Sequence, residues 1–195
     1  DEAAIAAIAV ELALAARIDD AVAMAGDHTN IGTIHLEEGR TDQAEAHFAA
    51  ALAVVEASDR DDRVKDQWRR GDLYNRGWLA VERGDLDAAR ALAAQLLAQS
   101  EVIGNLFVSR LAHQLAGIAA LAADDGETAL TELAQANQQN PANLLRQAQA
   151  AAAVGDEAAA KQYLHRTVDF NALNSLNYSL VRRQARAALS DPRER

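Results

Sequence analysis

Residues 77–97, GWLAVERGDLDAARALAAQLL, contain the pattern that decides the fold. An apolar helical run ends at Gly84, and Asp85 opens a second run whose apolar side chains recur on one helix face. This pattern predicts two helices that are joined by a tight turn and folded back on each other. Because the same pattern occurs three more times, we expect a stack of helical hairpins, which typically provides a binding surface.

Small residues recur at fixed positions in the four copies. The first helix of each copy has one at the same place: Gly32, Gly77, Gly117 and Ala148. Twelve residues later each copy has an alanine: Ala44, Ala89, Ala129 and Ala160. Four residues further on, a bulky side chain follows in three of the copies, and Ala93 is the exception among Phe48, Ala93, Leu133 and Leu164. The small residues of successive first helices are 45, 40 and 31 residues apart, counted from Gly32 to Gly77, Gly117 and Ala148 in turn.

These positions make residues 27–170 similar to the tetratricopeptide repeat (TPR) family, whose standard unit has about 34 residues. Asn140-Pro141 matches the closing proline of that family in the third copy. The resemblance implies an all-α fold, a right-handed α-α superhelix of about four hairpins, in which small residues let paired helices approach closely. We expect one domain over 1–195, made of an apolar helix over 1–17, hairpins over 18–57, 67–100, 105–138 and 141–169, and a C-terminal capping helix over 171–189.

Composition supports a helical protein and excludes several classes of function. Half of the 195 residues are hydrophobic but only 4% are aromatic, so the core must consist of Ala, Leu, Val and Ile. The chain has no cysteine, which excludes a disulfide, a thiolate nucleophile and a cysteine metal site. The net charge of -10 argues against a nucleic-acid partner, because phosphate binding needs clustered cations.

The N-terminal segment has an unusual pattern. Residues 3–16 are apolar except for Glu11, so a helix there needs covering on more than one side. It packs on the first repeat or also contacts another subunit or an upstream repeat. The run is shorter than the ~20 residues of a membrane span, and its acidic start differs from a signal sequence, so we expect no membrane insertion. Asp1 in place of methionine indicates a shortened or processed chain, which leaves the cytoplasm and, after signal removal, the periplasm or extracellular space open.

Local signals place several turns and helix starts. Gly39 predicts a left-handed helix end, Thr41 an N-cap, and Asn140-Pro141 a capped helix start. The charged segment 58–72 is either a connection or the extended start of the next helix. Asp124 to Glu127 predicts a turn between helices in preference to a calcium loop, because the alternating acidic ligands are missing.

The chain offers little that would support catalysis or a cofactor. His28 and His35 are seven residues apart and share a helix face, but no third ligand at a usual spacing accompanies them. Ordinary packing is therefore the preferred interpretation, and no metal site is expected. GxSxG, P-loop and GxGxxG motifs are absent. We expect no enzyme activity and no cofactor.

The resemblance also implies that the first helix of each hairpin lines an inner groove. The groove residues would be Thr29, Asn30, Thr33, Glu37, Tyr74, Asn75, Trp78, Gln114, Arg146 and Gln149. Tyr74 and Trp78 share one helix face and either hold a ligand or fill space between helices. A receptor for chaperone tails is disfavoured, because Asn75 alone matches a clamp position, whereas Thr29, Thr33, Leu111 and Leu115 replace the others.

Three hypotheses about function follow from these patterns. The preferred one is a non-enzymatic scaffold that binds a protein or peptide partner. The second is a self-assembling protein that stacks head-to-tail into a homo-oligomer or filament, since residues 1–20 are net acidic and residues 161–195 net basic. Its contact residues would be Ile5, Ile8, Leu12, Arg182, Arg183 and Arg186. The third, an enzyme or metal protein, has no supporting constellation.

Overall fold

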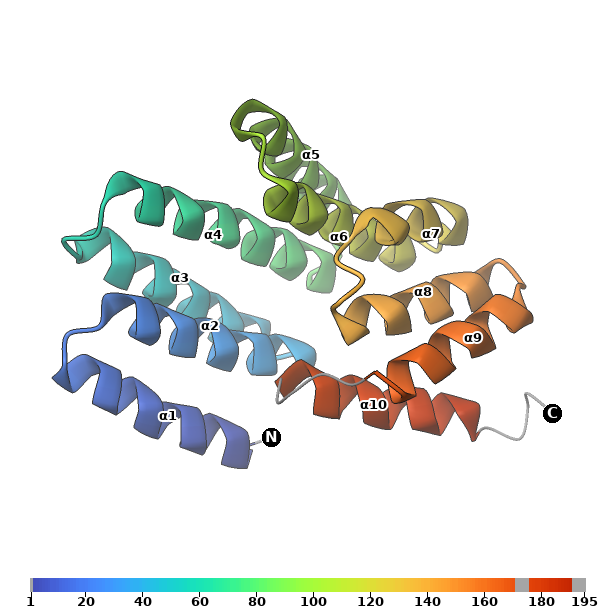
Figure 1. The fold of residues 1–195 in the computed structure, drawn as a ribbon, viewed down its shortest axis with the longest axis horizontal. Coiled ribbons are helices and arrows are strands. Elements are labelled where there is room, and N and C mark those ends of the chain that lie inside the picture. The colour runs from blue at the N-terminus through green and yellow to red at the C-terminus, as the bar shows by residue number, and fades with distance from the viewer. Residues whose placement is uncertain (1, 171–175, 191–195) are drawn as a thin grey trace. The chain divides into compact units, whose positions relative to one another are not determined.

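The computed structural model of the protein describes residues 2–170 and 176–190 (Figure 1). These residues form ten α-helices, and none of them lies in a strand, so the predicted all-α class is confirmed. From α1 to α4 and from α6 to α10, helices that follow one another in the sequence pack against each other, as expected for a helical repeat. The chain divides into two compact units, residues 1–88 and 89–195.

The first unit contains four complete helices and the first turn of a fifth. They are α1 (Glu2–Arg17), α2 (Ala21–Glu37), α3 (Thr41–Ala57), α4 (Asp62–Glu82) and the start of α5 (Leu86–Ile103). Along the chain, α1 packs on α2, α2 on α3 and α3 on α4. Two clusters of buried side chains join α2, α3 and α4. One contains Ala25, Ala51 and Val55 with Val64 and Trp68 against it, and the other contains Leu36, Ala44, Phe48 and Leu79 with Trp78 against it.

The second unit holds the rest of α5 and five further helices. These are α6 (Leu106–Ala122), α7 (Gly126–Gln135), α8 (Pro141–Ala153), α9 (Glu157–Val168) and α10 (Leu176–Leu189). Helix α8 is its centre, since it packs against α6, α7, α9 and α10 and buries most of its residues. Val181 and Ala185 of α10 join Leu164 of α9 in a cluster on α8.

One type of turn recurs between the helices. Seven residues after each small residue of the first helices, the backbone is left-handed, with φ of 73° at Gly39, 78° at Gly84, 57° at Asp124 and 79° at Gly155. The next residue donates its amide to a carbonyl five residues back, as Asp125 does to Ala120 at 2.9 Å. In three of these turns that residue is an aspartate that caps the second helix: Asp85, Asp125 and Asp156.

In the hairpins, the first helix approaches the second closely, as the small residues shared by the four copies predict. A Cβ added to Gly32 would lie 2.6 Å from Cε1 of Phe48, and one added to Gly117 would lie 2.6 Å from Cγ of Leu133. Each pair is sixteen residues apart. The small residue of the first helix therefore accommodates the bulky residue of the second helix in both units.

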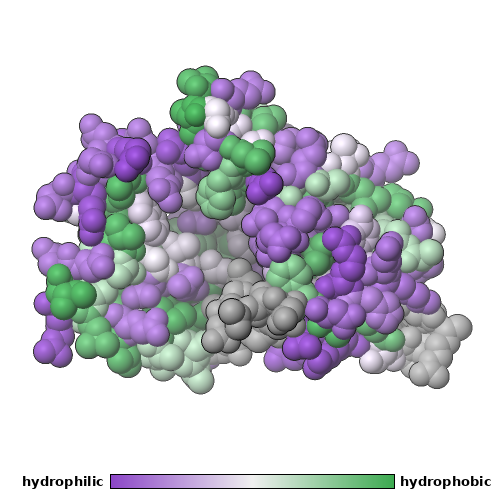
Figure 2. Space-filling view, in the orientation of Figure 1, coloured by the Kyte–Doolittle hydropathy of each residue, from purple (hydrophilic) through white to green (hydrophobic). Residues whose placement is uncertain are grey.

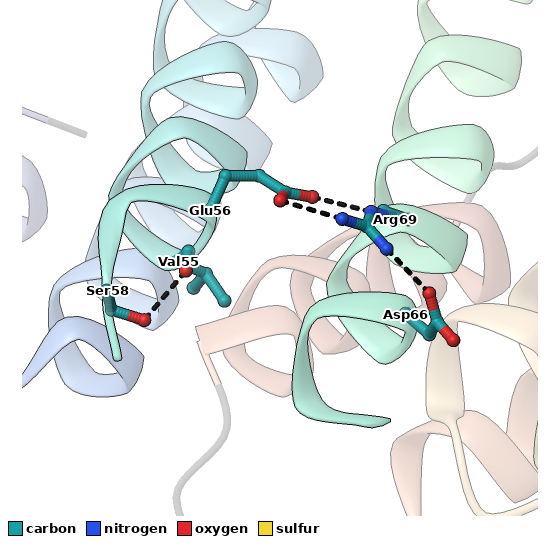
Figure 3. A network of polar contacts seen from close by, with 5 residues as sticks. All are labelled: Val55, Glu56, Ser58, Asp66 and Arg69. Atoms are coloured by element: carbon teal, nitrogen blue, oxygen red, sulfur yellow. Dashed lines mark hydrogen bonds and ion pairs between the residues drawn. The ribbon is translucent and has the colours of Figure 1, made fainter. Parts of the chain in front are cut away.

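The structure settles two local alternatives. The charged segment after α3 is mainly the start of the next helix, because Asp61 caps α4 through the amide of Val64 at 2.9 Å. Figure 3 shows how Arg69 ties this start to α3, with two bonds to Glu56 of 2.6 and 2.8 Å. Such partly exposed ion pairs contribute about 0–1 kcal/mol. The predicted cap at Thr41 is wrong, because Thr41 is already helical and follows Arg40, whose side chain makes no capping bond.

Two predicted segments are only partly covered. Positions 171–175 of the predicted C-terminal helix lie outside the described residues, and α10 begins at Leu176. The predicted hairpin over 67–100 extends across both units, so its pairing stays a prediction. Its turn lies in the first unit, where Asp85 caps the start of α5 through the amide of Ala88 at 3.0 Å.

Candidate functional site

Helix α2 presents a polar stripe on one face, made of Thr29, Asn30, Thr33 and Glu37. Their spacing of three and four residues places them along one side of the helix. Asn30 and Glu37 are exposed, and the two threonines are half-buried. The threonine hydroxyls donate to backbone carbonyls four residues back, each at 2.9 Å, which leaves their oxygens able to accept. The stripe thus places hydrogen-bonding groups and one carboxylate along one side of the helix.

Open space lies next to this stripe. Gly26 precedes Asn30 by one helical turn, and a Cβ added there would meet nothing within 4 Å. At this end of the stripe, α2 therefore has room for a side chain at position 26.

The aromatic pair of α4 lies mainly within the packing of the first unit. The rings of Tyr74 and Trp78 meet edge-on with centroids 6.0 Å apart, as their spacing predicts. Tyr74 is only 8% exposed, and Trp78 packs against the cluster that contains Leu36, Phe48 and Leu79. Asn75 on the same helix is half-buried. These contacts favour the interpretation that Trp78 fills space between helices.

In the second unit, the predicted groove residues have different environments. Gln114 of α6 is 6% exposed, and its Oε1 accepts a hydrogen bond of 3.1 Å from Nδ2 of Asn143. Arg146 is half-buried and donates to Oδ1 of Asn143 at 3.4 Å. Gln149 is exposed. Gln114 and Arg146 therefore support the structure of α8, and Gln149 faces solvent.

A buried amide network, which the sequence did not indicate, fixes the connection between α7 and α8. Asn143, fully buried, also donates to the carbonyl of Asn137 at 3.0 Å. Gln147 donates to Gln138 at 3.0 Å, and Gln138 donates to the carbonyl of Leu133 at 2.7 Å. Because buried amides are costly unless they are paired, these bonds fix one path for the connection. The available signal was the spacing of Asn143 and Gln147, two amide side chains four residues apart on α8.

Three histidines meet where α2 packs on α3. Nδ1 of His28 lies 3.0 Å from Nδ1 of His47, and the His35 ring lies 5.4 Å from the His47 ring, measured between centroids. Burial lowers the pKa of all three, and for His47 the two neighbouring imidazoles lower it further. In the described parts of the chain, no group of three or more histidine, aspartate or glutamate side chains is placed to hold a metal ion.

Sequence reasoning paired His28 with His35 and missed His47. The repeat register contained the signal, since His28 precedes Gly32 by four residues and His47 follows it by fifteen. The third copy has His113 and Glu132 at these same places, and there Nδ1 of His113 lies 2.8 Å from Oε2 of Glu132. Superposing the copies would have predicted both contacts across their hairpins.

The predicted self-association residues are less exposed than others near them. Ile5, Ile8 and Leu12 are half-buried, whereas Val10, Leu14 and Ile18 are 62%, 54% and 75% exposed. These last three are four residues apart and form one stripe, the α1 stripe. On α10, Arg183 and Arg186 are exposed and Arg182 is half-buried.

A second exposed apolar patch lies at the turn between α5 and α6. It contains Val102, Ile103, Leu106 and Phe107. Figure 2 shows apolar residues at this turn and at the turn between α1 and α2. Across the described residues, we find no helix with both the length and the apolar character that a membrane crossing requires.

Comparison of the chain with protein-family models, with curated proteins and with solved structures found no match.

Proposed function

We propose that the protein is a non-enzymatic scaffold of TPR-like hairpins that binds a protein or peptide partner. The polar stripe of α2 is the observation that carries this proposal, since it combines exposed polar side chains with the open space at Gly26. Close packing of α2 on α3 holds the stripe on a rigid element, which lowers the entropic cost of binding. The net charge of -10 favours a partner with cationic groups.

The proposal predicts which residues a bound peptide needs. A library of displayed 12-residue peptides, a length chosen for the test, would be selected on the full chain. A selected peptide would then be measured by fluorescence anisotropy. Replacing Asn30 and Glu37 together by alanine should weaken binding about tenfold or more, which corresponds to about 1.4 kcal/mol or more.

A matched variant controls for general effects of the substitutions. Gln43→Ala changes an exposed side chain on α3 and should leave the affinity unchanged. The proposal fails if no peptide is enriched, or if the double variant binds the selected peptide as well as the original chain.

The exposed α1 stripe supports a second candidate function, head-to-tail self-assembly. Val10, Leu14 and Ile18 present apolar surface that water disfavours, and a contact with another copy would cover it. The opposite net charges of the two terminal segments would favour a heterologous order, which closes into a ring or continues as a filament.

A further inference from the structure

We infer that the α2–α3 hairpin is acid-sensitive: it is stable while His28, His35 and His47 are neutral, and it loosens when these imidazoles take up protons. The inference stands apart from the proposed binding function, because it concerns the stability of the first unit and needs no ligand.

The contact between His28 and His47 depends on neutral rings. Their Nδ1 atoms are 3.0 Å apart, so one nitrogen must donate a proton and the other must accept with its lone pair. When both rings are protonated, both nitrogens carry hydrogens and neither can accept. Two positive charges would then lie at contact distance, which replaces a hydrogen bond by repulsion.

His35 adds a buried ring that has little capacity for charge. It is 8% exposed, and its Nδ1 atom is buried without a hydrogen-bond partner. Its ring also faces His47, which already contacts His28. Protonation of His35 would place an unpaired charge in the packed interface of the hairpin, which is costly.

Of the charged groups around the three histidines, some favour the protonated imidazoles and others oppose them. Asp27 of α2 favours the protonated form of His28, and Asp27 itself faces Glu11 of α1. At the other end, Glu38 favours a charged His35 and Arg40 opposes it. Burial outweighs these charges, since the pKa of each of the three rings lies below the ordinary value of 6.5.

The sign of the pH effect follows from these directions. Between the lowered pKa of the folded state and the value of 6.5 in the unfolded state, the unfolded chain binds more protons. The stability that the neutral cluster provides is therefore complete above pH 6.5 and is lost as the pH falls below it.

The third copy provides an internal comparison. His113 and Glu132 occupy the places of His28 and His47, and Nδ1 of His113 lies 2.8 Å from Oε2 of Glu132. The hairpin of α6 and α7 thus has a contact between an imidazole and a carboxylate at the place where the α2–α3 hairpin has a contact between two imidazoles.

Amide hydrogen exchange of the full chain, followed by NMR in buffer with EDTA at pH 7.5 and 5.5, tests the inference. After correction for the intrinsic pH dependence of exchange, amides of α2 and α3 should lose protection in acid, while those of α6 and α7 keep it. His47→Glu, which copies the His113–Glu132 arrangement, should remove or reverse the loss in α2 and α3. Glu132→Gln, the matched control, should leave that loss unchanged.

Histidine titration in the unmodified chain keeps the inference testable if His47→Glu does not fold. The Hε1 signals of His28, His35 and His47 should titrate below pH 6.5, the ordinary histidine value. Titration of His28 and His47 at or above that value would overturn the inference. Equal loss of protection in both hairpins, or an unchanged loss in His47→Glu, would also overturn it.

Discussion

Asp124 occupies a backbone conformation that other hairpins assign to glycine. Its φ of 57° is in the left-handed region, and the equivalent residues Gly39, Gly84 and Gly155 have φ of 73°, 78° and 79°. A side chain is disfavoured there because its Cβ approaches the following carbonyl oxygen. The turn between α6 and α7 therefore contains local strain that the equivalent turns at Gly39, Gly84 and Gly155 avoid.

Replacing this aspartate tests the turn directly. Asp124→Gly should raise the free energy of unfolding by roughly 0.5–1 kcal/mol, because glycine adopts the conformation without strain. Gly155→Ala, in the equivalent turn, should lower it by about 1–2 kcal/mol. Urea denaturation followed by circular dichroism measures both changes. A loss of stability in Asp124→Gly would show that the carboxylate contributes more than the strain costs.

At this scale, the sequence predicted what depends on one residue and its backbone. Gly39 and Asn140 gave the correct helix end and helix start, because left-handed conformations and caps have specific residue preferences. The prediction that Thr41 is an N-cap was wrong because Arg40, the residue before it, occupies the N-cap position. The contact of His28 with His47 joins two helices, so it required the repeat register and not the local sequence.

Among the helices, α4 shows how packing and not ligand binding can explain an aromatic pair. Trp78 contacts a buried cluster that includes side chains from α2 and α3. Trp78→Ala should therefore lower the free energy of unfolding by about 3–5 kcal/mol, as expected for truncating a core aromatic residue.

Asn75→Ala, on the same helix, provides a matched control and should change the stability by no more than about 0.5 kcal/mol. If Trp78→Ala leaves the melting transition intact but abolishes binding of a selected peptide, the aromatic pair is a ligand platform instead.

The start of α4 and the centre of α8 were harder to predict. The charged segment after α3 left two alternatives open, because exposed charges are compatible with a helix as well as with a loop. The ion pair between Arg69 of this segment and Glu56 of α3 forms only when α3 and α4 lie together. The amides of α8 were not predicted, because a buried Asn143 depends on partners from α6 and the α7–α8 connection.

For the whole molecule, the proposed head-to-tail assembly can be tested at the α1 stripe. If copies associate through it, Leu14→Glu should yield monomers in sedimentation experiments at low salt. Ala16→Glu adds the same charge on the opposite side of α1 and should leave assembly intact. Association should also weaken with salt, because the opposite charges of the termini are screened. An unmodified chain that is monomeric at high micromolar concentration contradicts this candidate function.

Hairpins in both units pack their paired helices in one common register, with a small residue of the first helix against a bulky residue of the second. Four glycine-to-alanine substitutions test it most directly, with the free energy of unfolding of the affected unit measured by urea denaturation. Helix propensity alone predicts that all four stabilise, by roughly 0.5–1 kcal/mol each.

The register predicts a division into two pairs. Gly26→Ala and Gly71→Ala add a Cβ in open space and should stabilise. Gly32→Ala and Gly117→Ala place a Cβ 2.6 Å from Phe48 and Leu133 and should destabilise by about 1–3 kcal/mol. If all four variants gain stability alike, the close approach in the two hairpins is absent and the common register is wrong.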